Sequence, residues 1–268
     1  YGFTERTNVD AMYRKKGIGT FDLEPQGNLQ DMINDLAKLP LEFSPGSRWN
    51  YSVSTDVLGY LIEKISGQSL DAYLQENIFT PLGMKDTAFY IPKDKQDRFS
   101  ACYMRGSKGE LALQDDPQES YYLNKPTFLS GGGGLISTAG DYLQFCKMLL
   151  NKGQLDGHQI IGKKTLAFMT TNHLPDGCDL GSIATGSFSE SLYDGVGFGL
   201  GFSVALDPTQ SKTITSVGEY AWGGAASTAF WIDPEEDMAV VFMTQLLPSS
   251  TYNFRGQLKQ LVYGAIVD

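Results

Sequence analysis

Apolar residues recur every three or four positions in the first third of the chain, and this spacing predicts three helices. Asn28 is placed to cap the first helix, which stops before Pro40. The second begins beyond Tyr51 and closes at Gly67. Its apolar face consists of Val57, Leu58, Leu61, Ile62 and Ile65. The third begins after Ser69 and ends at Pro81-Leu82-Gly83.

The next stretch carries weaker periodicity. Residues 85–127 contain scattered Pro, Gly and Asp, which indicates irregular chain with short strands. Thr138, followed three residues later by Asp141, matches a capping box and predicts a helix over 139–151. A short helix is expected over 163–171 and a polar loop over 172–195.

Beyond residue 195 the period changes to two, which predicts a half-buried strand over 198–206. A second short strand is expected over 212–218. Ser227–Ile232 and Met238–Thr244 predict a pair of strands joined by a hairpin. A last helix is expected to cover the sheet with Phe254, Leu258, Leu261, Val262 and Ile266.

Helices followed by an antiparallel sheet with a closing helix predict an α+β fold. We expect an antiparallel β-sheet flanked by helices, plus a mainly helical subdomain. A length of 268 residues suits one domain over 1–268. Within it, the helical subdomain is expected over 28–172, and the sheet with its C-terminal helix over 196–268.

The net charge of −10 opposes phosphate backbones and anionic membranes, so nucleic acid is not an expected partner. No apolar run is long enough to predict a transmembrane segment. Cys102, Cys146 and Cys178 lack metal-ligand spacing, and Cys146 is expected in the core. His158 and His173 are isolated, and no Gly-x-Ser-x-Gly elbow accompanies them. The sequence therefore implies no metal and no cofactor.

Tyr51 occupies a short connector between turn chemistry at Pro45-Gly46 and the second helix. Ser52, Ser54 or Thr55 can cap that helix, whose first turn carries Asp56. A phenol held there has a defined direction beside a positive helix end. The simpler interpretation is a partly buried aromatic residue, and the local sequence leaves both open.

Two glycine-containing stretches are further candidates. Ser130-Gly-Gly-Gly-Gly-Leu-Ile-Ser-Thr lacks the Lys-Ser/Thr pair of a phosphate-binding loop, so a tight backbone crossing is the preferred interpretation. In Glu219-Tyr-Ala-Trp-Gly-Gly-Ala, glycines beside a strand edge let a substrate approach the backbone, and an exposed N–H there can donate to an oxyanion. The alternative for this second stretch is a bulge before a core strand.

Taken in order, three features resemble the serine β-lactamase-related superfamily. They are Pro45-Gly-Ser-Arg-Trp-Asn-Tyr-Ser52, the Ser130–Thr138 glycine run with its capped helix, and Trp222-Gly223-Gly224 before a strand hairpin. This superfamily includes class C β-lactamases, penicillin-binding proteins, D-aminopeptidases and family VIII carboxylesterases, and the last are the nearest in pattern. The resemblance implies a β-lactamase/transpeptidase-like fold with a site between the sheet and the helical subdomain.

The first family motif, Ser-x-x-Lys, supplies the nucleophile and its base partner, and the chain contains no such spacing. The nucleophile is therefore not assigned, and we expect that the chain starts beyond that motif. The second motif, Tyr-x-Asn, falls on Tyr51-Ser52-Val53. Tyr51 matches the residue that relays protons. Val53 departs from the Asn that contacts the amide side chain of β-lactam substrates.

The third motif, Lys-Thr-Gly in β-lactamases, is replaced by Trp222-Gly223-Gly224, the form familiar from family VIII esterases. The replacement removes the cation that holds a β-lactam carboxylate. Ala225 matches the position whose backbone N–H forms half of the oxyanion hole. Trp222, with Gly223 and Gly224, is expected to form the substrate-side wall.

The resemblance implies a serine hydrolase that cleaves a small-molecule carboxylic ester through an acyl-enzyme. Within the same superfamily, a D-amino peptidase, a β-lactamase or an acyltransferase acting on a small ester or amide is the alternative. The alternative of another class is a non-catalytic binding homologue that keeps the fold without the nucleophile.

Overall fold

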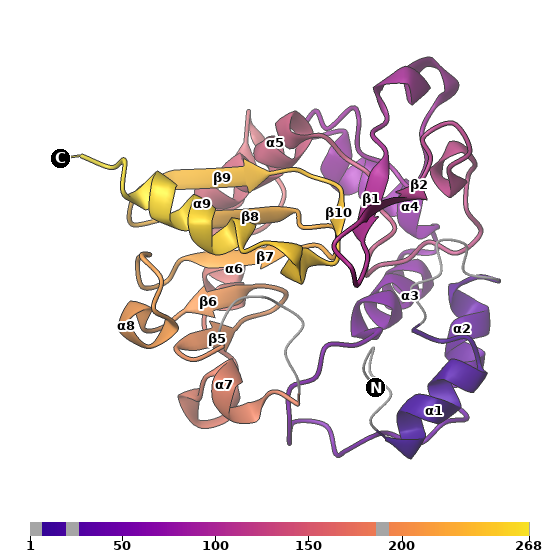
Figure 1. The fold of residues 1–268 in the computed structure, drawn as a ribbon, viewed down its shortest axis with the longest axis horizontal. Helices are drawn as coiled ribbons and strands as arrows, with labels where there is room; N and C mark the ends of the chain where they lie inside the picture. The colour runs from indigo at the N-terminus through magenta and orange to yellow at the C-terminus, as the bar shows by residue number, and fades with distance from the viewer. Residues whose placement is uncertain (1–6, 20–26, 186–192, 268) are drawn as a thin grey trace. The chain divides into compact units, whose positions relative to one another are not determined.

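A computed structural model describes residues 7–19, 27–185 and 193–267, and the chain divides into two compact units (Figure 1). The first, here called the helical unit, comprises Tyr1–Thr80, Lys85–Phe99 and Pro117–Ser137. The second, the sheet unit, comprises Pro81–Met84, Ser100–Asp116 and Thr138–Asp268.

The helical unit is built from short helices. Its regular elements are α1 (Asn8–Lys15), α2 (Leu29–Leu36), α3 (Ser54–Ser66), α4 (Leu70–Leu74), the π-helical turn η1 (Gln75–Phe79) and the 3₁₀ turns η2 (Lys93–Arg98) and η3 (Tyr121–Leu123). Leu29, Leu70, Phe89 and Leu129 form one of its buried apolar clusters. The three predicted helices are thus confirmed, as is the irregular character of the chain after residue 85.

Helix α2 shows why its start was predictable. The Asp31 N–H donates to the Asn28 side chain at 3.1 Å, and the Asn28 N–H donates back to the Asp31 carboxylate at 3.2 Å. This reciprocal capping box satisfies two backbone donors that the helix itself cannot pair.

Helix α3 packs through only part of the expected face, since Ile62 contacts the buried apolar cluster and Val57 is half-buried. Leu58, Leu61 and Ile65 are 57%, 45% and 83% exposed, whereas Asp56 and Gly59 are buried. A Cβ on Gly59 would lie 3.0 Å from Leu70 Cδ2, so the missing side chain lets α3 approach its neighbour closely. Apolar spacing therefore identified the helix but only part of its packed side.

The sheet unit contains a five-stranded antiparallel sheet in the order β5-β6-β7-β8-β9. Its strands are β5 (Val196–Phe198), β6 (Ser203–Ala205), β7 (Tyr220–Gly223), β8 (Ala229–Asp233) and β9 (Met238–Phe242). A smaller sheet joins β1 (Cys102–Arg105), β2 (Leu111–Asp115) and β10 (Leu246–Leu247), and β3 (Gln154–Leu155) pairs with β4 (His158–Gln159). The helices are α5 (Ala139–Leu150), α6 (Lys163–Met169), α7 (Leu180–Ile183), α8 (Pro208–Ser211) and α9 (Phe254–Tyr263).

Two strand predictions were wrong in detail. The expected strand over 198–206 is a hairpin, because Gly201 takes a φ of +105° and the Gly199 N–H donates to the Phe202 carbonyl at 2.8 Å. Residues 212–218 form no strand, since Lys212 ends α8 in the left-handed region and Gly218 makes a turn at φ +89°. The β8–β9 hairpin, by contrast, is confirmed.

The two faces of the large sheet are covered by different helices. Phe230 on β8 contacts the ring of Tyr142 on α5, with ring centroids 5.1 Å apart. Trp231, one residue on, turns to the opposite face and contacts Lys259 of α9. Helix α5 begins at Thr138, which accepts from the Asp141 N–H as predicted. Cys146 on α5 is fully buried, as expected, and burial raises its pKa to about 12.

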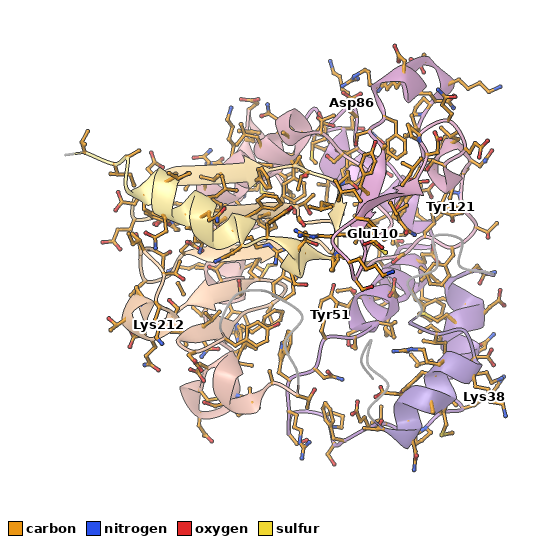
Figure 2. The ribbon with its side chains drawn as sticks, viewed as in Figure 1. Lys38, Tyr51, Asp86, Glu110, Tyr121 and Lys212 are labelled. Atoms are coloured by element: carbon orange, nitrogen blue, oxygen red, sulfur yellow. The ribbon has the colours of Figure 1, made fainter. Side chains whose placement is uncertain are left out.

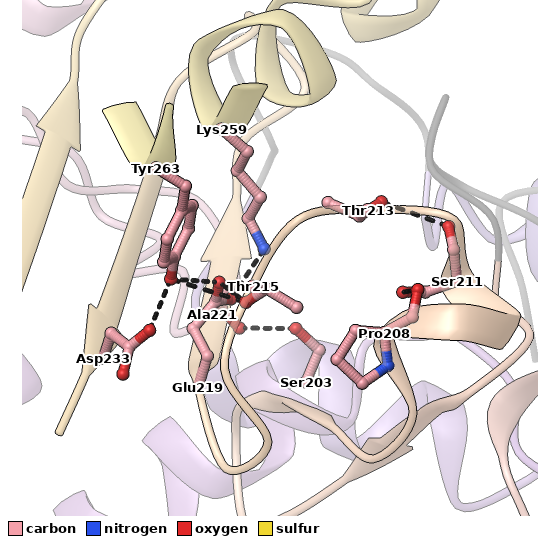
Figure 3. A network of polar contacts seen from close by, with 10 residues as sticks. All are labelled: Ser203, Pro208, Ser211, Thr213, Thr215, Glu219, Ala221, Asp233, Lys259 and Tyr263. Carbon is pink, nitrogen blue, oxygen red and sulfur yellow. Dashed lines mark hydrogen bonds and ion pairs between the residues drawn. The ribbon is translucent and has the colours of Figure 1, made fainter. Parts of the chain in front are cut away.

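Helix α9 presents a polar stripe to the sheet beside part of the predicted apolar face, of which Phe254 contacts Phe242 of β9. Leu261 is 71% exposed, whereas Lys259 and Tyr263 reach two buried carboxylates (Figure 3). Lys259 Nζ lies 2.7 Å from Glu219 Oε1, and the Tyr263 hydroxyl lies 2.6 Å from Asp233 Oδ2 and 3.1 Å from Glu219 Oε2. Burial and the charge of Glu219 raise the pKa of Tyr263. Carboxylates buried in a sheet require donors, and this requirement decides the orientation of α9.

Candidate functional site

Tyr51 lies on the connector into α3, where Figure 2 labels it, and it is half-buried. The turn before it is the one its residues predict. The Ser47 N–H donates to the Ser44 carbonyl at 3.1 Å, and Gly46 takes a φ of +83°. The chain thus reverses four residues before Tyr51 and enters a helix three residues after it.

The residues that follow Tyr51 start α3 without a direct side-chain cap. Val53 is the N-cap residue, and the Ser54 N–H donates to Ser52 Oγ at 3.1 Å. Val53 is only 7% exposed and packs with Tyr13 and Ile18. Its side chain therefore anchors the connector in the core of the helical unit.

The glycine run crosses the first turn of α3 at close range. A Cβ on Gly131 would lie 2.3 Å from the Thr55 carbonyl oxygen, so only glycine fits there. Ser130 Oγ donates to Asp56 Oδ1 at 2.6 Å, and the Gly132 N–H reaches the same oxygen at 3.2 Å. The predicted tight crossing is confirmed. The Ser130–Asp56 pair was missed, although a serine ahead of the glycines and an acid in the helix's first turn were visible in the sequence.

In the sheet unit, Trp222 and Gly223 end strand β7. Trp222 stacks edge-on against Phe198 with ring centroids 5.5 Å apart. It pairs across the strands with Phe230 and shares the α5 side of the sheet, whereas Gly223 faces the α9 side. Trp222 and Gly223 therefore face opposite sides of the sheet, and a substrate-side wall of Trp222, Gly223 and Gly224 stays a prediction.

The chain then makes a tight turn from Gly224 to Thr228. The Gly224 N–H donates to the Thr228 carbonyl at 3.0 Å, and the Ser227 N–H donates to the Gly224 carbonyl at 3.1 Å. Ser227 takes a φ of +70°. Ala225 sits in the centre of this turn and is exposed, and among the described residues its N–H has no hydrogen-bond acceptor.

Three side-chain and backbone contacts hold the turn from outside. Ser227 Oγ donates to the Leu246 carbonyl at 2.6 Å, and the Leu246 N–H donates to the Ala226 carbonyl at 3.1 Å. Arg255 Nη2 of α9 donates to the carbonyl of Gly224 at 2.9 Å. A turn held by several hydrogen bonds, with an exposed residue whose N–H has no acceptor among the described residues, is the arrangement that oxyanion stabilisation requires. The sequence stretch indicated the N–H, but Arg255, thirty-one residues from Gly224, was missed.

Other chemistry is sparse in the part of the chain that the structure describes. No cluster of three or more His, Cys, Asp or Glu side chains there has a metal-binding arrangement. None of its helices has the length and apolar character needed to cross a membrane. The His173 ring contacts the Phe168 ring edge-on, with ring centroids 4.4 Å apart. Tyr51 and Val53 belong to the helical unit, and Trp222, Gly223, Gly224 and Ala225 to the sheet unit.

Comparison with known proteins places the chain in a family. The Beta-lactamase family model matches residues 2–263, so the chain belongs to the beta-lactamase family. It is 32% identical over 252 residues to Protein Rv1367c of Mycobacterium tuberculosis (strain ATCC 25618 / H37Rv), which covers 92% of this chain and 59% of that protein. It is 28% identical over 259 residues to Esterase EstB of Burkholderia gladioli, covering 91% and 61%.

The fold is similar to that of a solved structure, EstCE1, a hydrolase with promiscuous acyltransferase activity. The TM-score is 0.77 at 26% identity, over 94% of this chain and 66% of that one. The β-lactamase-like α+β fold expected from the sequence is thereby confirmed. The chain spans about three fifths of the length of the two curated relatives, Protein Rv1367c and Esterase EstB.

Proposed function

We propose that the complete protein is a serine hydrolase that cleaves a small carboxylic ester through an acyl-enzyme. The observation that carries this proposal is the turn from Gly224 to Thr228 at the end of β7, in which Ala225 is exposed and its N–H has no acceptor among the described residues. The name of one similar protein, Esterase EstB, supports ester cleavage, and the description of EstCE1 as a hydrolase supports hydrolysis in general.

In this proposal a serine hydroxyl attacks the ester carbonyl, and the carbonyl oxygen takes the negative charge. The Ala225 N–H donates to that oxygen. Tyr51 carries the serine proton to the leaving alkoxide, which departs as the alcohol, and water then hydrolyses the acyl-enzyme. Because a free phenol has a pKa of about 10, Tyr51 needs a nearby cation to act near neutral pH. The expected source is the lysine of a Ser-x-x-Lys motif, which residues 1–268 do not contain.

Acyl transfer to an acceptor other than water is the second candidate, because the similar protein EstCE1 is a hydrolase with promiscuous acyltransferase activity. The acyl-enzyme would be the same, and an alcohol or amine would replace water in the second step. Val53 and Trp222 stand where β-lactamases place an amide and a cation. These two departures make β-lactam hydrolysis the least favoured reaction.

The test begins with the residues encoded ahead of Tyr1. A Ser-x-x-Lys at a helix start is expected there, and its absence from the complete gene would contradict the proposal in favour of a non-catalytic homologue. The 268-residue chain is expected to be inactive on p-nitrophenyl esters, whereas the complete protein hydrolyses them.

Tyr51→Phe in the complete protein should lower the acylation rate by about 10² or more, since proton transfer contributes of that order. Tyr60→Phe is the matched control, because it also removes one phenol hydroxyl, which donates to Gln30 at 2.7 Å within the helical unit. An unchanged acylation rate in Tyr51→Phe would refute the relay role.

A further inference from the structure

We propose that Arg255 is a positioning residue that holds the Gly224–Thr228 turn, and with it the Ala225 N–H, in the geometry that oxyanion stabilisation needs. The inference rests on the proposed function, because it explains what holds the proposed oxyanion donor, the Ala225 N–H, in place. Arg255 lies on α9, and its side chain contacts main-chain atoms of the turn.

The guanidinium joins the two ends of the turn. Arg255 Nη2 donates to the Gly224 carbonyl at 2.9 Å and to the Thr228 carbonyl at 3.2 Å. These are the same two carbonyls that accept the hydrogen bonds closing the turn, from the N–H groups of Ser227 and Gly224. A hydrogen bond from a charged donor is stronger than a neutral one. One cation therefore bridges the two carbonyls at which the turn closes and holds them close together.

Gly223 makes room for this contact. A Cβ there would lie 2.4 Å from the Arg255 guanidinium carbon, closer than atoms can approach. The guanidinium thus lies directly against the strand backbone. Glycine is therefore needed at position 223 to leave space for the Arg255 guanidinium, in addition to any space that it leaves for a substrate.

Helix α9 is held on the sheet by contacts of its own, and these contacts fix the position of Arg255. Arg255, Lys259 and Tyr263 follow one another at four-residue intervals and share one side of the helix. Lys259 binds Glu219 at 2.7 Å, and Tyr263 binds Asp233 at 2.6 Å. Phe254 adds a ring contact with Phe242 at 5.6 Å. The contacts that orient α9 therefore also orient the turn.

The first measurement needs no catalysis. Hydrogen exchange in the complete protein reports the closing bonds through the Gly224 and Ser227 amides. In Arg255→Met these two amides should exchange about tenfold faster or more, while Tyr220 in β7 is unaffected. Arg255→Lys should be intermediate, because one ammonium replaces the guanidinium. Unchanged exchange at Gly224 and Ser227 in both variants would overturn the proposal.

The second measurement uses the complete protein on p-nitrophenyl esters. Arg255→Met should lower kcat by about ten- to hundredfold with KM little changed, because a misplaced oxyanion donor weakens the transition state. Gly223→Ala, which displaces the guanidinium without removing its charge, should do the same. A rise in KM at constant kcat would indicate that Arg255 binds substrate, and would overturn the positioning role.

Met148→Ala on α5 is the matched control for lost stability, since Met148 is 1% exposed and α5 covers the opposite face of the sheet. It should unfold at lower temperature and keep kcat. If Met148→Ala lowers kcat as far as Arg255→Met does, the effect is general destabilisation and the inference fails. A wild-type protein without esterase activity would refute the proposed function itself, whereas an active wild type with unaffected Arg255 variants would refute only the inference.

Discussion

The glycine run crosses closely over α3, so alanine in this run should destabilise the fold at one position, and a second position of the same run supplies a matched control. Gly131 and Gly133 are two residues apart, and both are exposed. A Cβ on Gly131 would lie 2.3 Å from the Thr55 carbonyl oxygen and 3.0 Å from its carbon, whereas a Cβ on Gly133 meets nothing within 4 Å. Alanine therefore adds the same methyl group at both positions, but this group meets backbone atoms at position 131 and open space at position 133.

The magnitude follows from the distance. Because the obstacle at Gly131 is backbone, no side chain can rotate away, and either the glycine run or the first turn of α3 must shift. Overpacking of this kind costs about 1–3 kcal/mol. For a chain of this size, that corresponds to a Tm lower by about 2–10 °C. Gly133→Ala should stay within about 0.5 kcal/mol of the parent.

Thermal and urea unfolding of the two variants test this reasoning. Because the displaced turn lies just beyond Tyr51, Gly131→Ala in the complete protein should also lower kcat more than Gly133→Ala does. Equal unfolding midpoints for the two variants would show that the crossing is not as close as described. Glycine would then not be required at position 131.

Two further predictions concern charges. Tyr263→Phe removes the hydroxyl shared by the buried Asp233 and Glu219 carboxylates and should cost about 1–3 kcal/mol in urea unfolding, whereas Tyr252→Phe at an exposed position should cost little. Equal losses would contradict the network. Arg98 and Lys95 lower the pKa of Asp86 to about 2. Since the folded value lies below the unfolded one of about 3.9, Asp86 stabilises the fold above pH 4 and loses this effect as the pH falls toward 2. Asp86→Asn should flatten the dependence of Tm on pH in that window, and an unchanged slope would refute the assignment.

Local signals predicted the elements whose energetics are local. The Asn28 cap, the Thr138 cap and the β8–β9 hairpin each depend on residues close together in the chain, and the structure confirms all three. The glycine run was also interpreted correctly, because four glycines in succession leave a close backbone approach as the simplest reason for them. The division into 28–172 and 196–268 and the roles of the site residues stay predictions.

Partners distant in the sequence account for the errors at α3 and α9, and a local turn accounts for the error over 198–206. Helical spacing indicated an apolar face for α3 and for α9, yet Gly59 and Asp56 decide the packed side of α3, and Glu219 and Asp233 decide that of α9. Period-two alternation over 198–206 missed the hairpin because Gly201 was counted as a small strand residue although its φ is +105°.

The sequence by itself determined the fold class, the family resemblance and the candidate residues Tyr51, Trp222 and Ala225, because motifs and periodicity are local properties of a chain. Only the tertiary structure decided what surrounds them. It placed Ser130 on Asp56 at the start of α3, and Arg255 on the carbonyls of the turn that carries Ala225. These contacts join residues 74 and 31 positions apart, and no local pattern can specify such pairs, since their energy depends on how whole elements pack.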